Sequence, residues 1–584
     1  MNKYDIIIIG VGFSGAYAAL ELAKDGYSIL LLEKDSKVVG SRSSSFNQCY
    51  KLHSGVHYFG DAITASKCLH DSIICAKQWQ DFLLGEKDSA PRRNRHYIMS
   101  HSLFNVEEAR KVANMLKQIY LEFVQQDSSN EVFGDPKDFI KEVQPDQYGY
   151  VANEMNFVNQ NAVEEKTRVA LALDVGEPQI DIQRLQKHLQ HLITHTPNIT
   201  AKFDCEAISI TPQTNNFGYR VKAVKRNKKN ASKKIVEFST KGIVNCAWEN
   251  IENLDKTACF YSSNPDKLLI RMKISLLVKL PQELEHMDTC IFSLGPYCSI
   301  TNQFDGTAVL TYEPTTNIGH YFQGEKLPKK MQNIRNILEN GEDLKNTLVG
   351  KKLARDIVNG CAIYVPKIKN SKLLEVRVGY VKMYVAQSET YSIYERNSPI
   401  HRRREDGIIA QQGIASCYIS ASAMKMTYAQ SNAEKIRDIM QREILKRAEW
   451  ETIFREEQLA LPVRELNALA KELACALKPW LLKTITANSE PHDFLTKKNI
   501  FTKILSDILA ATNAELAYAK TIEEFANYAA TVYERVNMGS MPALPTLSKD
   551  SVTLEFFKPL TDPKLMAMMA SFFKPKDEYE PSEA

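Results

Sequence analysis

Residues 5–33 read DIIIIGVGFSGAYAALELAKDGYSILLLE. The run 6–9 is continuously apolar and β-branched, which is typical of a parallel strand buried on both faces. A glycine-rich turn at 10–15 follows, and the Ala- and Leu-rich stretch 16–24 has helical composition. Residues 28–33 form a second apolar run. The sequence therefore predicts a strand–helix–strand unit at the start of the chain.

The turn in this unit has GxGxxG spacing, and each glycine serves a different purpose. Gly10 permits a tight turn, Gly12 lets a diphosphate approach the backbone, and Gly15 allows the helix to pack on the strand. Backbone N–H groups at the helix N-terminus then face the anion. Glu33 ends the second strand, where its carboxylate is placed to accept hydrogen bonds from a ribose. The pattern predicts dinucleotide binding, with further contacts from Phe13, Ser14 and Lys34.

Composition narrows the class of protein. The 584 residues include 74 Lys+Arg and 70 Asp+Glu, a net charge of +4, with 44% hydrophobic residues. These values are ordinary for a soluble globular protein and argue against a nucleic-acid specialist. The eleven cysteines form no Cys-x-x-Cys pair, so neither a disulfide framework nor a metal site is predicted. No leader pattern or transmembrane span is recognised, and we expect a cytoplasmic protein.

The order of elements after the first unit favours a flavin. A helix is predicted over 181–194, strands over 206–212, 219–224 and 235–238, and a separate return strand over 242–247. A flavin-binding Rossmann domain inserts a three-stranded meander in this way before its late parallel strand. We therefore expect FAD rather than NAD. The sequence has no second GxGxxG motif, so the organic substrate is the expected source of electrons.

The predicted fold class is α/β, and it combines three parts. They are a Rossmann-type FAD-binding domain with an inserted β-meander, a strand-rich substrate domain, and a helical C-terminal domain that ends in an acidic tail. The helical domain is a candidate site for a protein partner. The tail resembles those of bacterial type IV secreted effectors and equally resembles an ordinary solubilising tail. The expected boundaries are 1–75, 165–260 and 395–440 for the FAD-binding domain, 76–164 and 261–394 for the substrate domain, and 441–584 for the helical domain.

Two further motifs carry a family resemblance. Residues 40–59 read GSRSSSFNQCYKLHSGVHYF. They resemble the D-amino-acid-oxidase-like superfamily of FAD-dependent oxidoreductases, especially its glycerol-3-phosphate dehydrogenase and 2-hydroxyglutarate oxidase branches, in which a Ser/Arg-rich turn precedes His-x-Gly-x-x-Tyr. Residues 423–427, Ala-Met-Lys-Met-Thr, are similar to the Gly-Gly-Lys-x-Thr turn of that superfamily, which closes over the flavin. The glycerophosphate branch has an arginine at the position of His57, which argues against a phosphorylated substrate.

The resemblance implies roles for specific residues. Additional cofactor contacts are expected from Arg42, Ser43, Ser44, Gly407, Met424 and Lys425. His53 and His57 are expected at the flavin, where an imidazole titrating near neutrality accepts the substrate's proton. Lys425 is the candidate cation that stabilises the negative charge near the flavin N1 when the flavin is reduced. The alternatives are that the two histidines only pack in the core, that Lys425 is a solvated lysine, or that His53 is covalently linked to the flavin.

Substrate anchoring is predicted from side-chain chemistry. An inward-pointing strand arginine suits a carboxylate, so the candidate substrate-binding residues are Tyr58, Arg271, Tyr312 and Arg377. The basic stretch 401–407 is either a solvated loop or a segment that reaches substrate or phosphate.

The predicted function is that of an FAD-dependent oxidoreductase. It oxidises a small hydroxy- or amino-bearing substrate by hydride transfer to the flavin N5, with an electron acceptor that the sequence does not specify. The alternatives are a flavin monooxygenase, or a non-catalytic FAD-containing protein that acts through its helical C-terminal domain.

Overall fold

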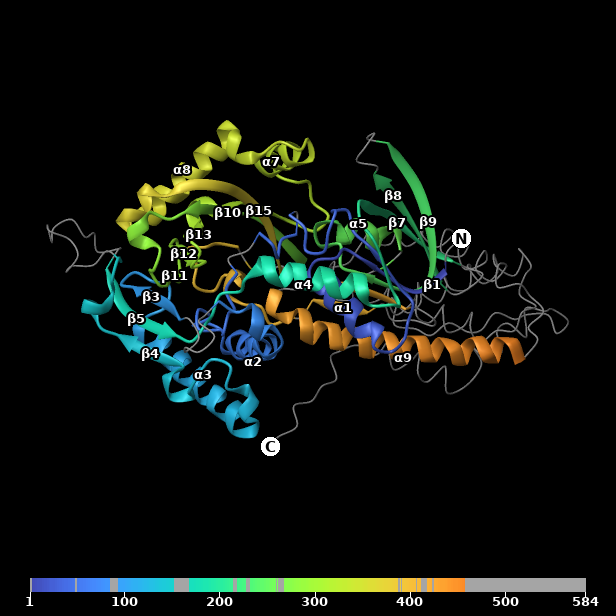
Figure 1. The fold of residues 1–584 in the computed structure, drawn as a ribbon, viewed down its shortest axis with the longest axis horizontal. Helices are drawn as coiled ribbons and strands as arrows, with labels where there is room; N and C mark the ends of the chain where they lie inside the picture. The colour runs from blue at the N-terminus through green and yellow to red at the C-terminus, as the bar shows by residue number, and fades with distance from the viewer. Residues whose placement is uncertain are drawn as a thin grey trace, which may run out of the picture.

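The computed structural model describes residues 3–41, 43–47, 50–84, 93–151, 168–213, 218–226, 232–258, 260, 267–386, 389, 391–405, 407–410, 417–422 and 425–456. The predictions for Arg42 and Met424, and for the helical domain beyond residue 456, lie outside these residues. The described residues form two β-sheets surrounded by helices, an α/β fold as predicted (Figure 1). The domain boundaries given above stay predictions.

The first sheet contains the glycine motif. Its strands follow the order β16-β17-β9-β1-β2-β6, and β8 joins β7 to the edge of β9. The five strands from β17 to β6 run parallel to one another. The bounds are β1 (Lys3–Ile9), β2 (Ile29–Leu32), β6 (Ile199–Lys202), β7 (Cys205–Gln213), β8 (Gly218–Arg226), β9 (Lys233–Asn245), β16 (Ile408–Ala410) and β17 (Tyr418–Ala421).

The apolar run of β1 is buried on both faces of this sheet. Ile6 and Ile8 face a core formed with α1 (Phe13–Ala23), α4 (Ile182–His195) and α9 (Ala429–Glu456). Because side chains alternate along a strand, Ile7 and Ile9 face the opposite core, which includes residues of β7, β8 and α5 (Ile251–Thr257). This two-sided burial explains why the sequence here shows no polar alternation.

One prediction for this sheet is wrong. Residues 235–238 and 242–247 are not two separate strands, because β9 runs without interruption from Lys233 to Asn245. Its first part pairs antiparallel with β8, and its second part, from Ser239, pairs parallel with β1. The Thr240 hydroxyl at the changeover donates a hydrogen bond to the Asp5 carbonyl 2.9 Å away, which ties β9 to β1. The meander and the parallel sheet are therefore continuous.

The second sheet follows the order β14-β10-β13-β12-β11-β3-β5-β4, and β15 also pairs with β10. The helices α7 (Lys329–Glu339) and α8 (Leu348–Ala362) contribute apolar residues to its core, and the short helix α6 (Glu313–Thr316) follows β13. The bounds are β3 (Asn94–Met99), β4 (Ile140–Val143), β5 (Val169–Val175), β10 (Lys267–Lys279), β11 (Thr289–Ser293), β12 (Cys298–Asn302), β13 (Thr307–Tyr312), β14 (Asn317–Phe322) and β15 (Lys372–Val385).

Two more helices complete the arrangement. The helix α2 (Ala62–Trp79) packs against α3 (Val106–Gln126) and α9, and its apolar residues join the core that lies under α1 (Figure 1). The segment 50–61 immediately precedes α2 and carries the His-x-Gly-x-x-Tyr motif. Anchoring of α2 therefore holds this motif at one end.

Candidate active site

A cavity of about 420 Å³ extends from the glycine turn of the first sheet to β10 and β11 of the second. Its walls come from the β1–α1 turn, residues 43–58, the segment after β9, and Lys425 and Met426. Segments far apart in the sequence thus meet around one space, which is the usual construction of a ligand site.

The glycine turn has the close contacts that its motif predicts. Gly10 adopts φ +87°, and a Cβ there would lie 2.5 Å from the Cys246 carbonyl oxygen. A Cβ on Gly15 would lie 2.0 Å from the Gly10 carbonyl oxygen, so only glycine fits at this position. A Cβ on Gly12 would meet, among the described residues, only Ser43 Oγ at 3.5 Å, and both residues line the cavity. The Gly12 backbone is therefore open to a ligand.

Glu33 reaches this turn from the end of β2. Its Oε2 accepts a hydrogen bond from the Val11 N–H at 2.6 Å, and its Oε1 accepts one from the Asp35 N–H at 2.8 Å. Burial raises the pKa of Glu33, while the two backbone donors act in the opposite direction. The carboxylate lines the cavity at the position where the motif predicts a ribose.

These features fit FAD. The open backbone at Gly12, the N-terminus of α1 beginning at Phe13 and the carboxylate of Glu33 together suit a diphosphate and a ribose. Every predicted cofactor residue of this region that the structure describes lines the cavity: Gly10, Gly12, Phe13, Ser14, Gly15, Glu33, Lys34, Ser43 and Ser44.

The two histidines of the 53–58 segment lie next to each other in the cavity wall. Their ring centroids are 4.3 Å apart, and the His57 ring lies 4.1 Å from that of Tyr58. The Nδ1 atoms of His53 and His57 have no hydrogen-bond partner among the described residues. Burial, together with nearby positive charge, lowers the pKa of both imidazoles well below the ordinary value. Both rings are therefore neutral at pH 7.

Lys425 adds a buried cation to the same wall. Its Nζ lies 3.2 Å from Cys68 Sγ and 4.3 Å from the centre of the Tyr58 ring. Burial acts to lower the pKa of Lys425, but the contacts with Cys68 and Tyr58 raise it above the ordinary value. The ammonium thus stays charged near the two histidines, which favours an anionic partner in the cavity.

Sequence reasoning missed the polar group that supports this wall from behind. The carboxylate of Glu177 is buried and accepts hydrogen bonds at 2.6 Å from both the N–H and the hydroxyl of Ser54. It also accepts bonds from Asn94 and lies 3.1 Å from His96 Nε2. Because Ser54 follows His53 directly, Glu177 fixes the histidine segment. No local pattern marks Glu177, since its partners come from other strands and segments.

Trp248 is a second cavity residue that the sequence did not indicate. It adopts φ +49°, which is unusual for a bulky residue, and its Nε1 has no partner among the described residues. Lys382 on β15 supports it, with Nζ 4.8 Å from the indole centre and a hydrogen bond to the Trp248 carbonyl. Burial lowers the pKa of Lys382 to about 7.

This shift predicts a pH-dependent effect of Lys382→Met. An unfolded lysine holds its proton up to about pH 10.4, so between pH 7 and that value unfolding takes up a proton and wild-type stability rises with pH. We expect the stability of Lys382→Met relative to wild type to fall by about 3 kcal/mol from pH 7 to pH 9.5. Chemical denaturation at the two pH values measures it. Lys372 is exposed on the same strand, and Lys372→Met is the control. Its stability relative to wild type should not change between the two pH values. If the free energy of unfolding differs between Lys382→Met and wild type by the same amount at both pH values, the lowered pKa of Lys382 is contradicted.

The remaining predicted residues divide into two groups. Lining the cavity are His53, His57, Tyr58, Arg271 and Lys425. Three others are not among the described lining residues, namely Gly407, Tyr312 and Arg377.

Gly407 and Tyr312 make contacts away from the cavity wall, whereas Arg377 contacts Tyr50, which lines the cavity. The Gly407 carbonyl accepts a hydrogen bond from the Ser422 N–H. Tyr312 packs against Gly360 of α8. Arg377 binds the Tyr50 hydroxyl and Glu375.

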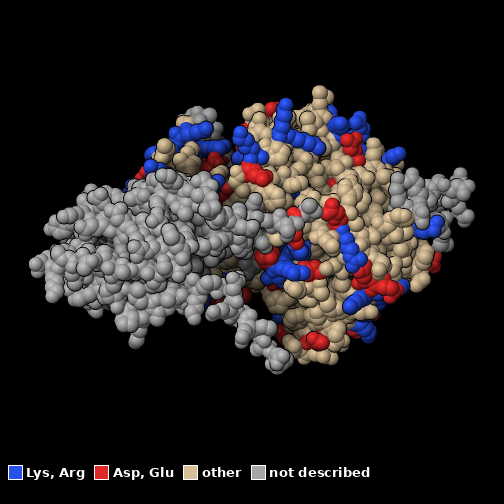
Figure 2. Space-filling view, turned by 180° about the vertical axis from the view of Figure 1, so that it is seen from behind, with Lys and Arg blue, Asp and Glu red and all other residues tan. Residues whose placement is uncertain are grey.

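Basic and acidic side chains are mixed on the surface, in line with their nearly equal numbers in the sequence. On the face shown in Figure 2, Lys and Arg side chains alternate with Asp and Glu. None of the helices in the described ranges is both long and apolar enough to cross a membrane. Within the same ranges, no group of three or more His, Cys, Asp or Glu residues is placed to hold a metal ion.

Residues 5–158 match the family model DAO, described as FAD dependent oxidoreductase. All-trans-retinol 13,14-reductases from Macaca fascicularis and Homo sapiens are each 37% identical over 59 residues, and this segment spans only 10% of this chain and 10% of each relative. Similar solved structures include glycine oxidase from Geobacillus kaustophilus, with 12% identity and a TM-score of 0.46. Another is L-α-glycerophosphate oxidase from Mycoplasma pneumoniae with FAD bound, with 14% identity and a TM-score of 0.46. Both alignments cover 76% of this chain and 95% of the other. Residues 5–158 therefore carry a DAO-type domain of the FAD-dependent oxidoreductase family.

Proposed function

We propose that this oxidoreductase oxidises a small molecule at a carbon that bears a hydroxyl or an amine. FAD, when bound in this cavity, would supply the redox chemistry as the hydride acceptor. The observation that carries the proposal is the pair His53 and His57, whose neutral rings line the cavity that begins at the glycine turn and whose buried Nδ1 atoms have no hydrogen-bond partner among the described residues. A cofactor held only for structural reasons would not require such a pair.

The histidines act in the proposed reaction by taking up a proton. As the substrate C–H bond breaks, the hydroxyl or ammonium group must also lose a proton for the C=O or C=N bond to form. A neutral imidazole in hydrogen-bond reach accepts that proton. The lowered pKa of His57 keeps this ring available as a base at neutral pH. Its contact with Tyr58 orients the ring.

Other residues of the chain hold the components in place. Glu33, Gly12 and Ser43 line the part of the cavity that suits the adenosine diphosphate. Lys425 adds positive charge near the histidines, where negative charge develops during the reaction. Glu177 acts as a positioning residue through Ser54, because its two hydrogen bonds fix the backbone next to His53.

Anaerobic mixing with a panel of amino acids and hydroxy acids tests the proposal. We expect at least one compound to bleach the flavin absorbance band, since hydride transfer to N5 removes the oxidised chromophore. Bleaching by NADPH alone, with consumption of NADPH, would instead indicate a monooxygenase. Retention of a fully oxidised flavin with every compound would contradict the proposal and favour a non-catalytic role.

A further inference from the structure

The ammonium group of Lys425 lies in the cavity wall without a carboxylate partner. Its Nζ is 3.2 Å from Cys68 Sγ and 4.3 Å from the centre of the Tyr58 ring, and none of the described Asp or Glu residues forms an ion pair with it. A lysine carries its charge on a flexible four-carbon stem, so the acceptors of its N–H groups decide where the charge lies. For Lys425 the nearest polar acceptor is a sulfur atom.

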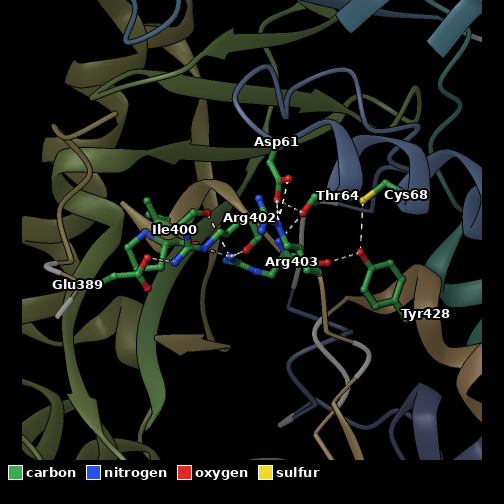
Figure 3. A network of polar contacts seen from close by, with 10 residues as sticks. Asp61, Thr64, Cys68, Glu389, Ile400, Arg402, Arg403 and Tyr428 are labelled. Carbon is green, nitrogen blue, oxygen red and sulfur yellow. Dashed lines mark hydrogen bonds and ion pairs between the residues drawn. The ribbon is translucent and has the colours of Figure 1, made fainter. Parts of the chain in front are cut away.

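Cys68 is fully buried on α2, and it is not among the described residues that line the cavity. Its Sγ nevertheless has two polar neighbours. One is Lys425 Nζ, and the other is the hydroxyl oxygen of Tyr428, 3.6 Å away (Figure 3). A buried free cysteine usually behaves as a small hydrophobic residue. This sulfur instead lies between an ammonium group and a hydroxyl group.

The directions of these hydrogen bonds follow from the protons that each group carries. The Tyr428 hydroxyl donates its single proton to the Arg403 carbonyl at 2.8 Å (Figure 3). Burial raises the pKa of Tyr428, so this proton stays in place. The hydroxyl oxygen is therefore an acceptor for the S–H of Cys68. Since the thiol proton points to Tyr428, the lone pairs of the sulfur are left to accept an N–H of Lys425.

This chain of hydrogen bonds ends on a backbone group that α2 also holds. The Arg403 N–H donates to Thr64 Oγ1 at 2.7 Å, and Thr64 lies on α2 one turn before Cys68 (Figure 3). The helix thus fixes Cys68 directly and the Arg403 backbone through Thr64. Hydrogen bonds that run in one direction along a chain also strengthen one another. The acceptor offered to Lys425 is therefore rigidly placed.

We propose that Cys68 is a positioning residue that holds the Lys425 ammonium in the cavity wall and so raises the reduction potential of the flavin. A positive charge in this wall stabilises the reduced cofactor, because reduction leaves negative charge on the flavin. Without the sulfur, Lys425 loses a buried acceptor, and its flexible side chain turns toward others. The inference rests on the role of Lys425 in the proposed function and assigns to Cys68 the task of supporting that role.

Reductive titration of the FAD-loaded protein against a reference dye measures the midpoint potential of the flavin. We expect Cys68→Ala to shift the equilibrium toward oxidised flavin about tenfold, which is about 30 mV for two electrons. Cys68→Ser should keep most of the wild-type potential, because a hydroxyl also accepts from Lys425 and donates to Tyr428. A Cys68→Ala protein with the wild-type potential would overturn the proposal.

Cys75→Ala is the matched control. Cys75 is also fully buried on α2, two turns further along, and its thiol donates to the Thr427 carbonyl at 3.2 Å. The substitution thus removes a contact between α2 and the same 425–428 segment without touching the ammonium of Lys425. Its flavin potential should remain that of wild type. A shift as large as that of Cys68→Ala would mean that loosened packing is the cause, and the proposal would fail.

A double substitution shows whether Cys68 acts through Lys425. Lys425→Met removes the cation and should lower the potential at least as much as Cys68→Ala does. In the Lys425→Met background, Cys68→Ala should cause little further change, because the effects of two residues that act through one interaction do not add. If the two shifts add in full, or if Lys425→Met leaves the potential unchanged, Cys68 does not act by holding this cation.

The result is independent of the test of the proposed function, because a chemical reductant replaces the substrate. If the expected shifts are found but no amino or hydroxy acid bleaches the flavin, the role of Cys68 stands and the proposed function fails. If a substrate bleaches the flavin but Cys68→Ala keeps the wild-type potential, the proposed function stands and the role of Cys68 is overturned.

Discussion

Gly12→Asp is expected to give a folded protein that no longer binds FAD. Gly12 is the N-cap residue of α1 with φ −70°, which any residue adopts, and aspartate is a preferred N-cap residue. An added Cβ meets only Ser43 Oγ at 3.5 Å among the described residues, so the substitution fits the protein itself. Its carboxylate nevertheless enters the cavity where the diphosphate is expected, and like charges repel there. We expect FAD affinity to fall about 100-fold or more.

The ratio of flavin absorbance to protein, measured together with circular dichroism, checks this result. Gly12→Ala is the matched control, since a methyl group adds bulk without charge and should cost less affinity. Gly15→Ala should instead disturb the turn, because its Cβ would lie 2.0 Å from a backbone oxygen. A Gly12→Asp protein that retained full FAD content would contradict the placement of the diphosphate.

His57→Ala is expected to slow flavin reduction by substrate about 100-fold or more while FAD stays bound, because general-base catalysis contributes at least that much. Stopped-flow measurement of flavin bleaching under anaerobic conditions gives the rate. His70→Ala is the control, since His70 is exposed on α2 and does not line the cavity. A rate within threefold of wild type would remove His57 from the proposed mechanism.

The same base predicts the direction of the pH dependence. Burial lowers the pKa of His57, so the imidazole loses its proton at a lower pH than an exposed histidine. The acid limb of kcat/KM should therefore lie below pH 6.5, and activity should be lost only as the pH falls through that lower value. An acid limb centred at or above pH 6.5 would show that a different group is the base.

The sequence predicted the strand, the glycine turn and the helix at the start of the chain because the residues that form them are close together along the chain. Residues 5–33 contain the strand, the glycine turn, the helix and Glu33, and short-range patterns report all of them. The sequence did not predict one continuous strand β9. Near Thr240 the strand exchanges one pairing partner, β8, for another, β1, while its backbone stays extended. Such a change depends on β1 and β8, which a local pattern does not include.

The substrate end was harder to predict because tertiary contacts define it. Arg271 and Arg377 lie on the paired strands β10 and β15, and Arg377 stands opposite Ser275. Ser275 is four residues from Arg271, on the same face and about 13 Å along the strand. Because both arginines lie in strand patterns, the sequence predicted both as substrate-binding residues, although only Arg271 of the two lines the cavity. Arg403 lies in a basic stretch that resembled a solvated loop, and its burial depends on Thr64 and Tyr428 from other segments.

Occupation of the cavity at the glycine turn by FAD can be measured in the absorbance spectrum of the purified protein, recorded before and after denaturation and acid precipitation. We expect an oxidised flavin spectrum with close to one FAD per chain, and release of FAD into the supernatant if the cofactor is not covalently attached. Well-folded protein that shows no flavin absorbance and takes up none from added FAD would contradict it.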